Sequence, residues 1–222
     1  MQEFRFDIIL YYLPMLLRGT LLTIGISILS IILGSLLGLI VGFGRMSARA
    51  YFRLPAACYI NFFRGTPLLV QILIVHFGVV PALVGHTDVM IAAVLSMTLN
   101  SAAYTAEIFR AGIQSVEKGQ TEASLSLGMT HRQTMRYIIL PQAIKRMVPA
   151  FGNEFIVLIK DSSLLTVIAA KELMYYANVM RGQYMRIWEP YLTAAIIYLI
   201  LTYSLSKLLN WWERRISQFE QS

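Results

Sequence analysis

Four long stretches of this chain carry no charged side chain, and they constrain its fold more than any other feature. They cover residues 19–44, 65–87, 89–106 and 190–206. A helix needs about 17–25 apolar residues to cross the hydrocarbon core of a bilayer, and the fourth stretch only just reaches that length. Only 14% of the residues are charged and 57% are hydrophobic, whereas soluble domains carry about 25% charged residues. These features predict an all-α integral membrane protein.

The distribution of basic residues predicts how the helices cross the membrane. We expect about five spans in a single transmembrane domain covering residues 1–222, at 20–43, 55–80, 89–109, 149–169 and 190–209. With these spans, 12 of the 19 Lys and Arg residues fall on one side, which the positive-inside rule makes the cytoplasmic side. The N-terminus is then outside, the C-terminus is in the cytoplasm, and the segment 171–189 is an outside loop with helical character. The net charge of +7 therefore reflects membrane orientation and gives no reason to expect nucleic-acid binding.

Small residues and prolines suggest how these helices pack and where they bend. Gly34, Gly38 and Gly42 repeat at four-residue intervals, a pattern that lets two membrane helices approach closely. The alternative is that membrane helices simply tolerate glycine at these positions. Residues 1–18 suggest an amphipathic lead-in, and Pro55 can begin the second span. Cys58 is the only cysteine, so an intrachain disulfide or a cysteine-based metal site is excluded.

A polar loop at about 119–141 separates the third and fourth spans. Thr121 can cap a short helix of about two turns, and Gly128 can end it in a left-handed turn. Composition alone favours an ordinary connector at the membrane surface for this segment. Six of its residues share a spacing of E-A-x4-G-x9-I-x-L-P: Glu122, Ala123, Gly128, Ile138, Leu140 and Pro141.

This spacing resembles the cytoplasmic coupling loop of permease subunits in ABC importers. Segments 63–67, 104–120, 140–143 and 160–164 are similar to the polar-amino-acid branch of that family, so the resemblance covers nearly the whole chain. Ser124 stands where the family's loop more often has a second alanine. The resemblance implies a type I ABC importer fold in the bacterial inner membrane. It implies that ATPase coupling involves Glu122, Ala123, Ser124, Leu125, Leu127, Gly128, Met129 and Arg132.

The resemblance also implies partners. We expect two copies of an ATP-binding subunit, a second permease copy (the same chain or a close paralogue) and an extracytoplasmic amino-acid-binding protein. The chain has no G-x-x-x-x-G-K-[ST] phosphate loop, so ATP and Mg²⁺ are expected in the partner subunit. We expect the chain itself to be non-catalytic, with no cofactor and no metal of its own.

Polar residues at bilayer depth indicate a substrate path, because ionisable groups are costly there. Glu154 and Asp161 are seven residues apart, so at about 100° per residue they share one helix face within roughly 20°. Their mutual repulsion requires a nearby positive charge, which a cationic amino acid, Arg64, Arg146 or a partner subunit could supply. The alternative is that both carboxylates only pair with protein groups.

Two further features complete the candidate site. Glu107 and Arg110 can form an i,i+3 ion pair, which favours a structural role for Glu107. Gly65 and Pro67 interrupt a helix, and unwound backbone at membrane depth can line a cavity. The candidate substrate-binding residues are Gly65, Thr66, Pro67, Gln71, Tyr104, Glu107, Glu154, Asp161, Ser162 and Ser163.

The resulting hypothesis is a permease subunit of an ATP-driven importer that forms the translocation pathway for a cationic amino acid such as arginine, lysine or histidine. Glutamine, glutamate and cystine stay open as substrates, and so does the choice between homodimer and heterodimer. A gradient-driven secondary transporter or channel subunit is the alternative, because buried carboxylates without an ATP-binding motif suit it as well.

Overall fold

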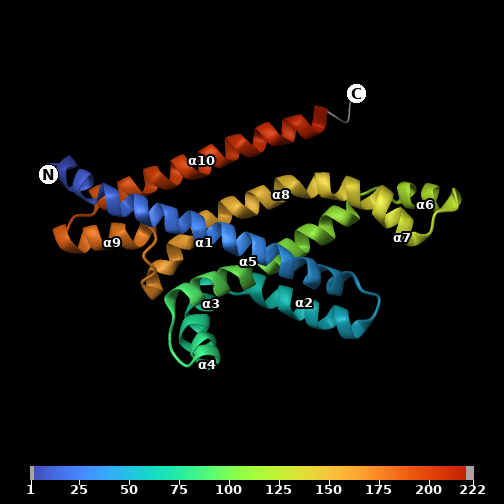
Figure 1. The fold of residues 1–222 in the computed structure, drawn as a ribbon, viewed down its shortest axis with the longest axis horizontal. Helices are drawn as coiled ribbons and strands as arrows, with labels where there is room; N and C mark the ends of the chain where they lie inside the picture. Colours follow the sequence, from blue (N-terminus) through green and yellow to red (C-terminus); the bar gives the residue numbers. More distant parts are fainter. Residues whose placement is uncertain (1–2, 219–222) are drawn as a thin grey trace.

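The computed structural model describes residues 3–218, with side chains described as far as Trp212. All regular secondary structure in the described part is helical, as expected, and the helices form an elongated bundle (Figure 1). The elements are α1 (Phe6–Met46), α2 (Ala50–Gly65), α3 (Leu68–Ile74), the π-helix η1 (Val75–Val79), α4 (Val80–Val84), α5 (Val89–Gln114), α6 (Lys118–Ser126), α7 (His131–Thr134), the π-helix η2 (Met135–Ile139), α8 (Leu140–Asp161), the 3₁₀-helix η3 (Ser162–Ile168), α9 (Leu173–Tyr184) and α10 (Trp188–Gln218).

The helix bounds differ from the expected spans in three places. α1 runs without a break through the expected lead-in and first span, because interfacial polar residues do not stop a helix. Pro55 lies inside α2 and does not begin it; the chain breaks later, at Pro67. α8 begins at Leu140, so Pro149 lies in its interior.

Length and hydropathy identify fewer spans in the described residues than the five we expected. α1, α5 and the Trp188–Trp212 part of α10 each suffice to cross a membrane, and α2 with the segment Leu68–Val84 adds a fourth if this pair, bent by 109°, is one span. The expected span 149–169 falls on α8 and η3. Glu154, Lys160 and Asp161 interrupt its apolar character, so that segment is recognised less by hydropathy than by its place in the bundle.

The glycine series brings α1 against α5, which confirms the close approach expected from the spacing. A Cβ atom built on Gly34 would lie 2.9 Å from the Cβ of Ser101, and one built on Gly38 would lie 2.8 Å from the backbone oxygen of Ala102. Thr105 donates a 3.0 Å hydrogen bond to the Gly34 carbonyl. Backbone contact of this kind leaves no room for a side chain, so the glycines set the distance between the two helices.

We expect Gly38→Val to destabilise the chain by about 1–3 kcal/mol or more, because α5 backbone blocks the new side chain. Gly25→Val is the matched control, since nothing lies within 4 Å of a Cβ at that exposed position on the same helix. The thermal midpoint of the purified protein in detergent measures both variants. Equal midpoints for the two would contradict the packing described here.

At the end of the molecule where α9 lies, Glu172 joins three helices. It is fully buried and caps α9 by accepting hydrogen bonds from the amides of Met174 and Tyr175 at 2.8 and 2.7 Å. The Tyr198 hydroxyl on α10 donates to it at 3.0 Å, and its backbone contacts α1 at Gly19. Burial raises the pKa of Glu172 to about 7 from an ordinary 4.5, against the opposing effect of these three donors.

The raised pKa of Glu172 predicts a pH-dependent stability. Between about pH 4.5 and 7 Glu172 binds more protons in the folded chain than in the unfolded chain, so its contribution to the free energy of unfolding falls as the pH rises through this window. Between pH 4.5 and 7 the free energy of unfolding falls by at most about 3 kcal/mol through this residue. Thermal midpoints measured from pH 4.5 to 8 should show this fall in the wild type and a flatter profile in Glu172→Gln. The exposed-site variant Glu117→Gln should keep the wild-type profile, and an unchanged profile in Glu172→Gln would exclude Glu172 as the cause.

Candidate translocation site

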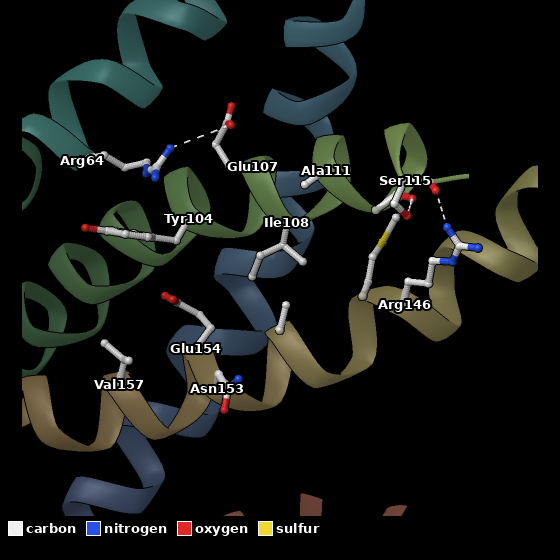
Figure 2. Close-up of a pocket in the computed structure, with 13 residues that line it drawn as sticks. Arg64, Tyr104, Glu107, Ile108, Ala111, Ser115, Arg146, Asn153, Glu154 and Val157 are labelled. Atoms are coloured by element: carbon white, nitrogen blue, oxygen red, sulfur yellow. Dashed lines mark hydrogen bonds and ion pairs between the residues drawn. The ribbon is translucent and has the colours of Figure 1, made fainter. Parts of the chain in front are cut away.

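A cavity of about 680 Å³ lies where the end of α2 meets α5 and α8 (Figure 2). Its walls combine four charged side chains with small and apolar residues, which suits a solute that has both charged and apolar parts. The lining residues are Arg64, Tyr104, Glu107, Ile108, Ala111, Gly112, Ser115, Arg146, Met147, Ala150, Asn153, Glu154 and Val157.

The cavity brings together three of the ten candidate substrate residues, namely Tyr104, Glu107 and Glu154. The other seven do not line it: Gly65, Thr66, Pro67, Gln71, Asp161, Ser162 and Ser163. Asp161 ends α8, and the hydroxyls of Ser162 and Ser163 donate to backbone carbonyls one turn earlier. The shared face expected for Glu154 and Asp161 therefore does not place both carboxylates in this cavity.

The wall of the cavity that α8 forms was predicted only in part from the sequence. Arg146, Ala150, Asn153 and Val157 line the cavity from α8, and their spacing of three or four residues is that of one helix face. That spacing could have identified the wall, but Ala150 and Asn153 carry no charge, so neither residue alone indicates a substrate site in the sequence. Arg146 also donates a hydrogen bond to the Ser115 carbonyl, which ties α8 to the end of α5.

Glu107 is neutralised within the chain. Arg110 binds its carboxylate at 2.7 Å, which confirms the expected i,i+3 pair, and Arg64 lies 3.8 Å away. The Arg64 guanidinium also lies over the Tyr104 ring, 5.3 Å from its centre, a distance suited to a cation–π contact. Arg64 is thus held at the cavity wall from α5 while 44% of its side chain stays exposed.

Glu154 supplies the second carboxylate of the cavity wall. Its residue is 8% exposed, and its side chain points from α8 toward Tyr104 and α5 (Figure 2). None of the ion pairs described among side chains up to Trp212 involves it. A buried carboxylate without a cation is costly unless it is neutralised or meets a positive ligand, so Glu154 is the cavity residue best suited to a cationic solute.

The helix break at Gly65–Pro67 is present, as expected. α2 ends at Gly65, Thr66 has an extended backbone, and α3 begins after Pro67. The Thr66 hydroxyl and the Gln71 amide are engaged with groups of the break itself. Contact between these residues and substrate stays a prediction.

The second candidate region, the loop between α5 and α8, folds into the short helices α6 and α7 and the π-helix η2. α6 begins at Lys118, so Thr121 lies inside the helix and is not its cap as expected. Gly128 has φ +82° and ends this unit in the left-handed turn expected of it. Thr130 and Gln133 form a capping box at the start of α7, which the T-x-x-Q spacing could have indicated.

Most of the expected coupling residues are accessible, with one exception. Leu127 is 84% exposed, and Glu122, Ala123, Gly128 and Arg132 are exposed as well. Ser124 is buried, and its hydroxyl donates to the Thr134 hydroxyl at 2.9 Å. Ser124 therefore holds α6 against α7 rather than facing a partner, while Leu125 and Met129 are half-buried.

Together these features define a class of protein: a helical membrane subunit with a charged cavity between its helices and a protruding polar loop. A family model described as the binding-protein-dependent transport system inner membrane component matches residues 34–218. The chain therefore belongs to this family, which is located in the inner membrane. The expected type I ABC importer fold and the resemblance seen in the sequence are both confirmed.

Individual relatives agree with this assignment. The arginine transport system permease protein ArtQ of Bacillus subtilis (strain 168) is 39% identical over 208 residues, covering 92% of this chain and 93% of the relative. The glutamine transport system permease protein GlnP of Escherichia coli (strain K12) is 38% identical over 205 residues, covering 92% and 94%. The L-cystine transport system permease protein TcyB of Bacillus subtilis (strain 168) is 41% identical over 207 residues, covering 93% and 88%.

Solved structures are similar over nearly the full length. A crystal structure of an amino acid ABC transporter with histidines contains a chain that is 42% identical, with a TM-score of 0.91 and coverage of 96% of this chain and 100% of that chain. The MetNI methionine ABC transporter in an inward-facing conformation has a TM-score of 0.78 at 23% identity, with coverage of 92% and 97%. The second similarity concerns the fold alone.

Proposed function

We propose that this chain is the non-catalytic permease subunit of an ATP-driven amino-acid importer. Its cavity would form part of the pathway for a cationic amino acid such as arginine, lysine or histidine. The observation that carries the proposal is Glu154, a buried carboxylate in the cavity wall without an ion-pair partner among the described side chains. The relatives named above transport different amino acids, so the choice of a cationic substrate rests on this residue.

The charges of the cavity suit the two ends of such a solute. Arg64 and Arg146 lie in the wall together with Asn153 and can bind a carboxylate through charge-assisted hydrogen bonds. Glu154 can bind a guanidinium or ammonium group, and Tyr104 offers a ring face between Arg64 and Glu154 (Figure 2). Glu107 is already paired with Arg110, so it contributes to holding Arg64 more than to charge recognition.

Energy for transport would come from a separate ATP-binding subunit docked on α6 and the Gly128 turn. Two such ATPases, holding ATP and Mg²⁺, would act on a permease pair, which is either a homodimer or a pair with a close paralogue. An extracytoplasmic binding protein would deliver the amino acid. In this arrangement the N-terminus lies outside and α6 lies in the cytoplasm, in agreement with the positive-inside rule.

The proposal is tested by uptake into proteoliposomes that contain the chain with its ATPase and, in the outer solution, the binding protein. We expect ATP inside the vesicles to drive uptake of labelled arginine, lysine or histidine, with glutamine and glutamate transported more slowly. Uptake that persists in ATP-depleted vesicles and follows an ion gradient would instead support the secondary-transporter alternative. Preferred uptake of a neutral or acidic amino acid would contradict the proposed substrate class.

A further inference from the structure

The helix break between α2 and α3 leaves a backbone group without its usual partner. In a continuous helix the Phe63 carbonyl would accept a hydrogen bond from residue 67, but that residue is Pro67, which has no N–H. The Val70 amide bonds to the Pro67 carbonyl, so the Thr66 carbonyl lacks its helical donor too. Buried carbonyls without donors are costly, and such groups are nearly always satisfied in folded proteins.

Gln71 supplies the missing donor. Its Nε2 lies 2.8 Å from the Phe63 carbonyl, 3.1 Å from the Thr66 carbonyl and 2.9 Å from the Thr66 hydroxyl. The Thr66 hydroxyl in turn donates to the Phe62 carbonyl at 2.8 Å. Because both backbone oxygens can only accept, the nitrogen of the Gln71 amide must face them, and its oxygen faces the other way.

Asn100 on α5 holds that oxygen. Its Nδ2 donates to Gln71 Oε1 at 2.8 Å and approaches the Phe63 carbonyl at 3.4 Å. Gln71 is 2% exposed and Asn100 is 5% exposed, so neither amide can exchange these bonds for water. We call this pair, Gln71 and Asn100, the amide clamp.

The clamp fixes the backbone on both sides of Arg64, since Phe63 immediately precedes Arg64 and Thr66 follows two residues later. From this backbone the Arg64 side chain reaches Glu107 at 3.8 Å and the Tyr104 ring at 5.3 Å. Both contacts lie on α5, one to two turns from Asn100 on the same helix. The clamp and these contacts therefore hold the end of α2 against α5 from two directions.

We propose that Gln71 and Asn100 are positioning residues that aim Arg64 into the cavity, so that it meets the carboxylate of the transported amino acid. This inference rests on the proposed function of the cavity. It also changes the role of Gln71, which acts through the backbone around Arg64 and does not itself touch substrate. A displacement of about 1 Å at such a contact can cost roughly 100-fold in function.

The experiment measures the half-saturating arginine concentration and the maximal rate of ATP-driven uptake in the reconstituted complex. Gln71→Met keeps the length of the side chain and removes its hydrogen bonds, and Arg64→Ala removes the group that the clamp aims. We expect each variant to raise the half-saturating concentration about tenfold or more, with a maximal rate within about twofold of wild type. The double variant should resemble Arg64→Ala alone, because residues that act through one another are not additive.

Two further variants keep the test decisive. Asn100→Ser removes the bond to Gln71 Oε1 and the longer contact with the Phe63 carbonyl, and it leaves the bonds that Gln71 donates. It should raise the half-saturating concentration about threefold, and it serves as the test variant if Gln71→Met does not assemble. Gln183→Leu removes a glutamine that bonds to Tyr12 on α1, far from the cavity lining, and should behave as wild type. As with Gln71→Met, the effect of Asn100→Ser should vanish in the Arg64→Ala background.

The outcomes separate this inference from the proposed function. Suppose that Arg64→Ala raises the half-saturating arginine concentration while the clamp variants match wild type. The clamp then has no positioning role, and the cavity assignment stands. The same conclusion follows if the effects of the clamp variants multiply with the effect of Arg64→Ala. If Arg64→Ala transports arginine with an unchanged half-saturating concentration, the cavity assignment fails and this inference fails with it.

Discussion

Replacing Glu154 with Gln should abolish the advantage of arginine as a substrate. The substitution keeps the shape of the side chain and removes its charge, so a guanidinium entering the cavity would lose its counter-charge in a buried site. Loss of one partner of a buried charge pair costs about 2–5 kcal/mol, which corresponds to roughly 30-fold or more in affinity. Uptake of labelled arginine by the reconstituted complex, measured over a range of concentrations, gives this value directly.

The matched control for this prediction is Glu172→Gln, which removes a second buried carboxylate outside the cavity. It should change stability and its pH dependence without changing the half-saturating arginine concentration at a temperature where the complex is intact. The Glu154→Gln complex should still assemble with its ATPase. Normal arginine affinity in Glu154→Gln would show that this carboxylate does not recognise the charge of the substrate.

The second large effect is expected at the tip of the coupling loop. Leu127 follows α6 with 84% of its surface exposed, although burying a leucine side chain contributes about 1.5–3 kcal/mol. An exposed leucine on a protruding turn suits an anchor in a partner's pocket. Leu127→Asp should therefore weaken binding of the ATPase by roughly 30-fold or more, measured as the amount of ATPase that co-purifies with the permease.

Ser126, the exposed residue before Leu127, offers a control for the effect of an added charge alone. Ser126→Asp introduces the same carboxylate one position earlier on α6, where the side chain only bonds to the Glu122 carbonyl. It should retain most of the ATPase. Gly128→Val should resemble Leu127→Asp, because φ +82° strains a β-branched residue and would displace the turn. Undiminished ATPase recovery with both Leu127→Asp and Gly128→Val would place the docking surface elsewhere.

Much of the fold follows from local features of the sequence. Uncharged stretches locate α1, α5 and α10, and the glycine repeat at Gly34, Gly38 and Gly42 indicates a close helix contact that the structure places against α5. The break at Pro67 and the left-handed turn at Gly128 follow from the backbone preferences of proline and glycine. Each of these features depends on only a few neighbouring residues, which is why sequence alone can reveal them.

The bounds of α8 and the composition of the cavity depend on contacts between distant segments. The sequence predicts a span at 149–169, but the observed helix ends at Asp161 and continues only as 3₁₀-helix. Gln71 lies near the break in sequence and was expected to bind substrate, yet the donor requirement of the Phe63 carbonyl and the position of Asn100 give it an internal partner. Similarly, Ser124 faces Thr134 because α7 folds back on α6. Such assignments require knowledge of which segments meet in space.

The central claim is that the cavity between α2, α5 and α8 holds the transported amino acid with its side chain toward Glu154. A structure of the assembled transporter determined with arginine bound tests this claim most directly. We predict arginine in this cavity of the permease, with its carboxylate near Arg64 and its guanidinium within hydrogen-bond distance of Glu154. Arginine bound elsewhere in the permease, or bound here with no contact to Glu154, would contradict the account.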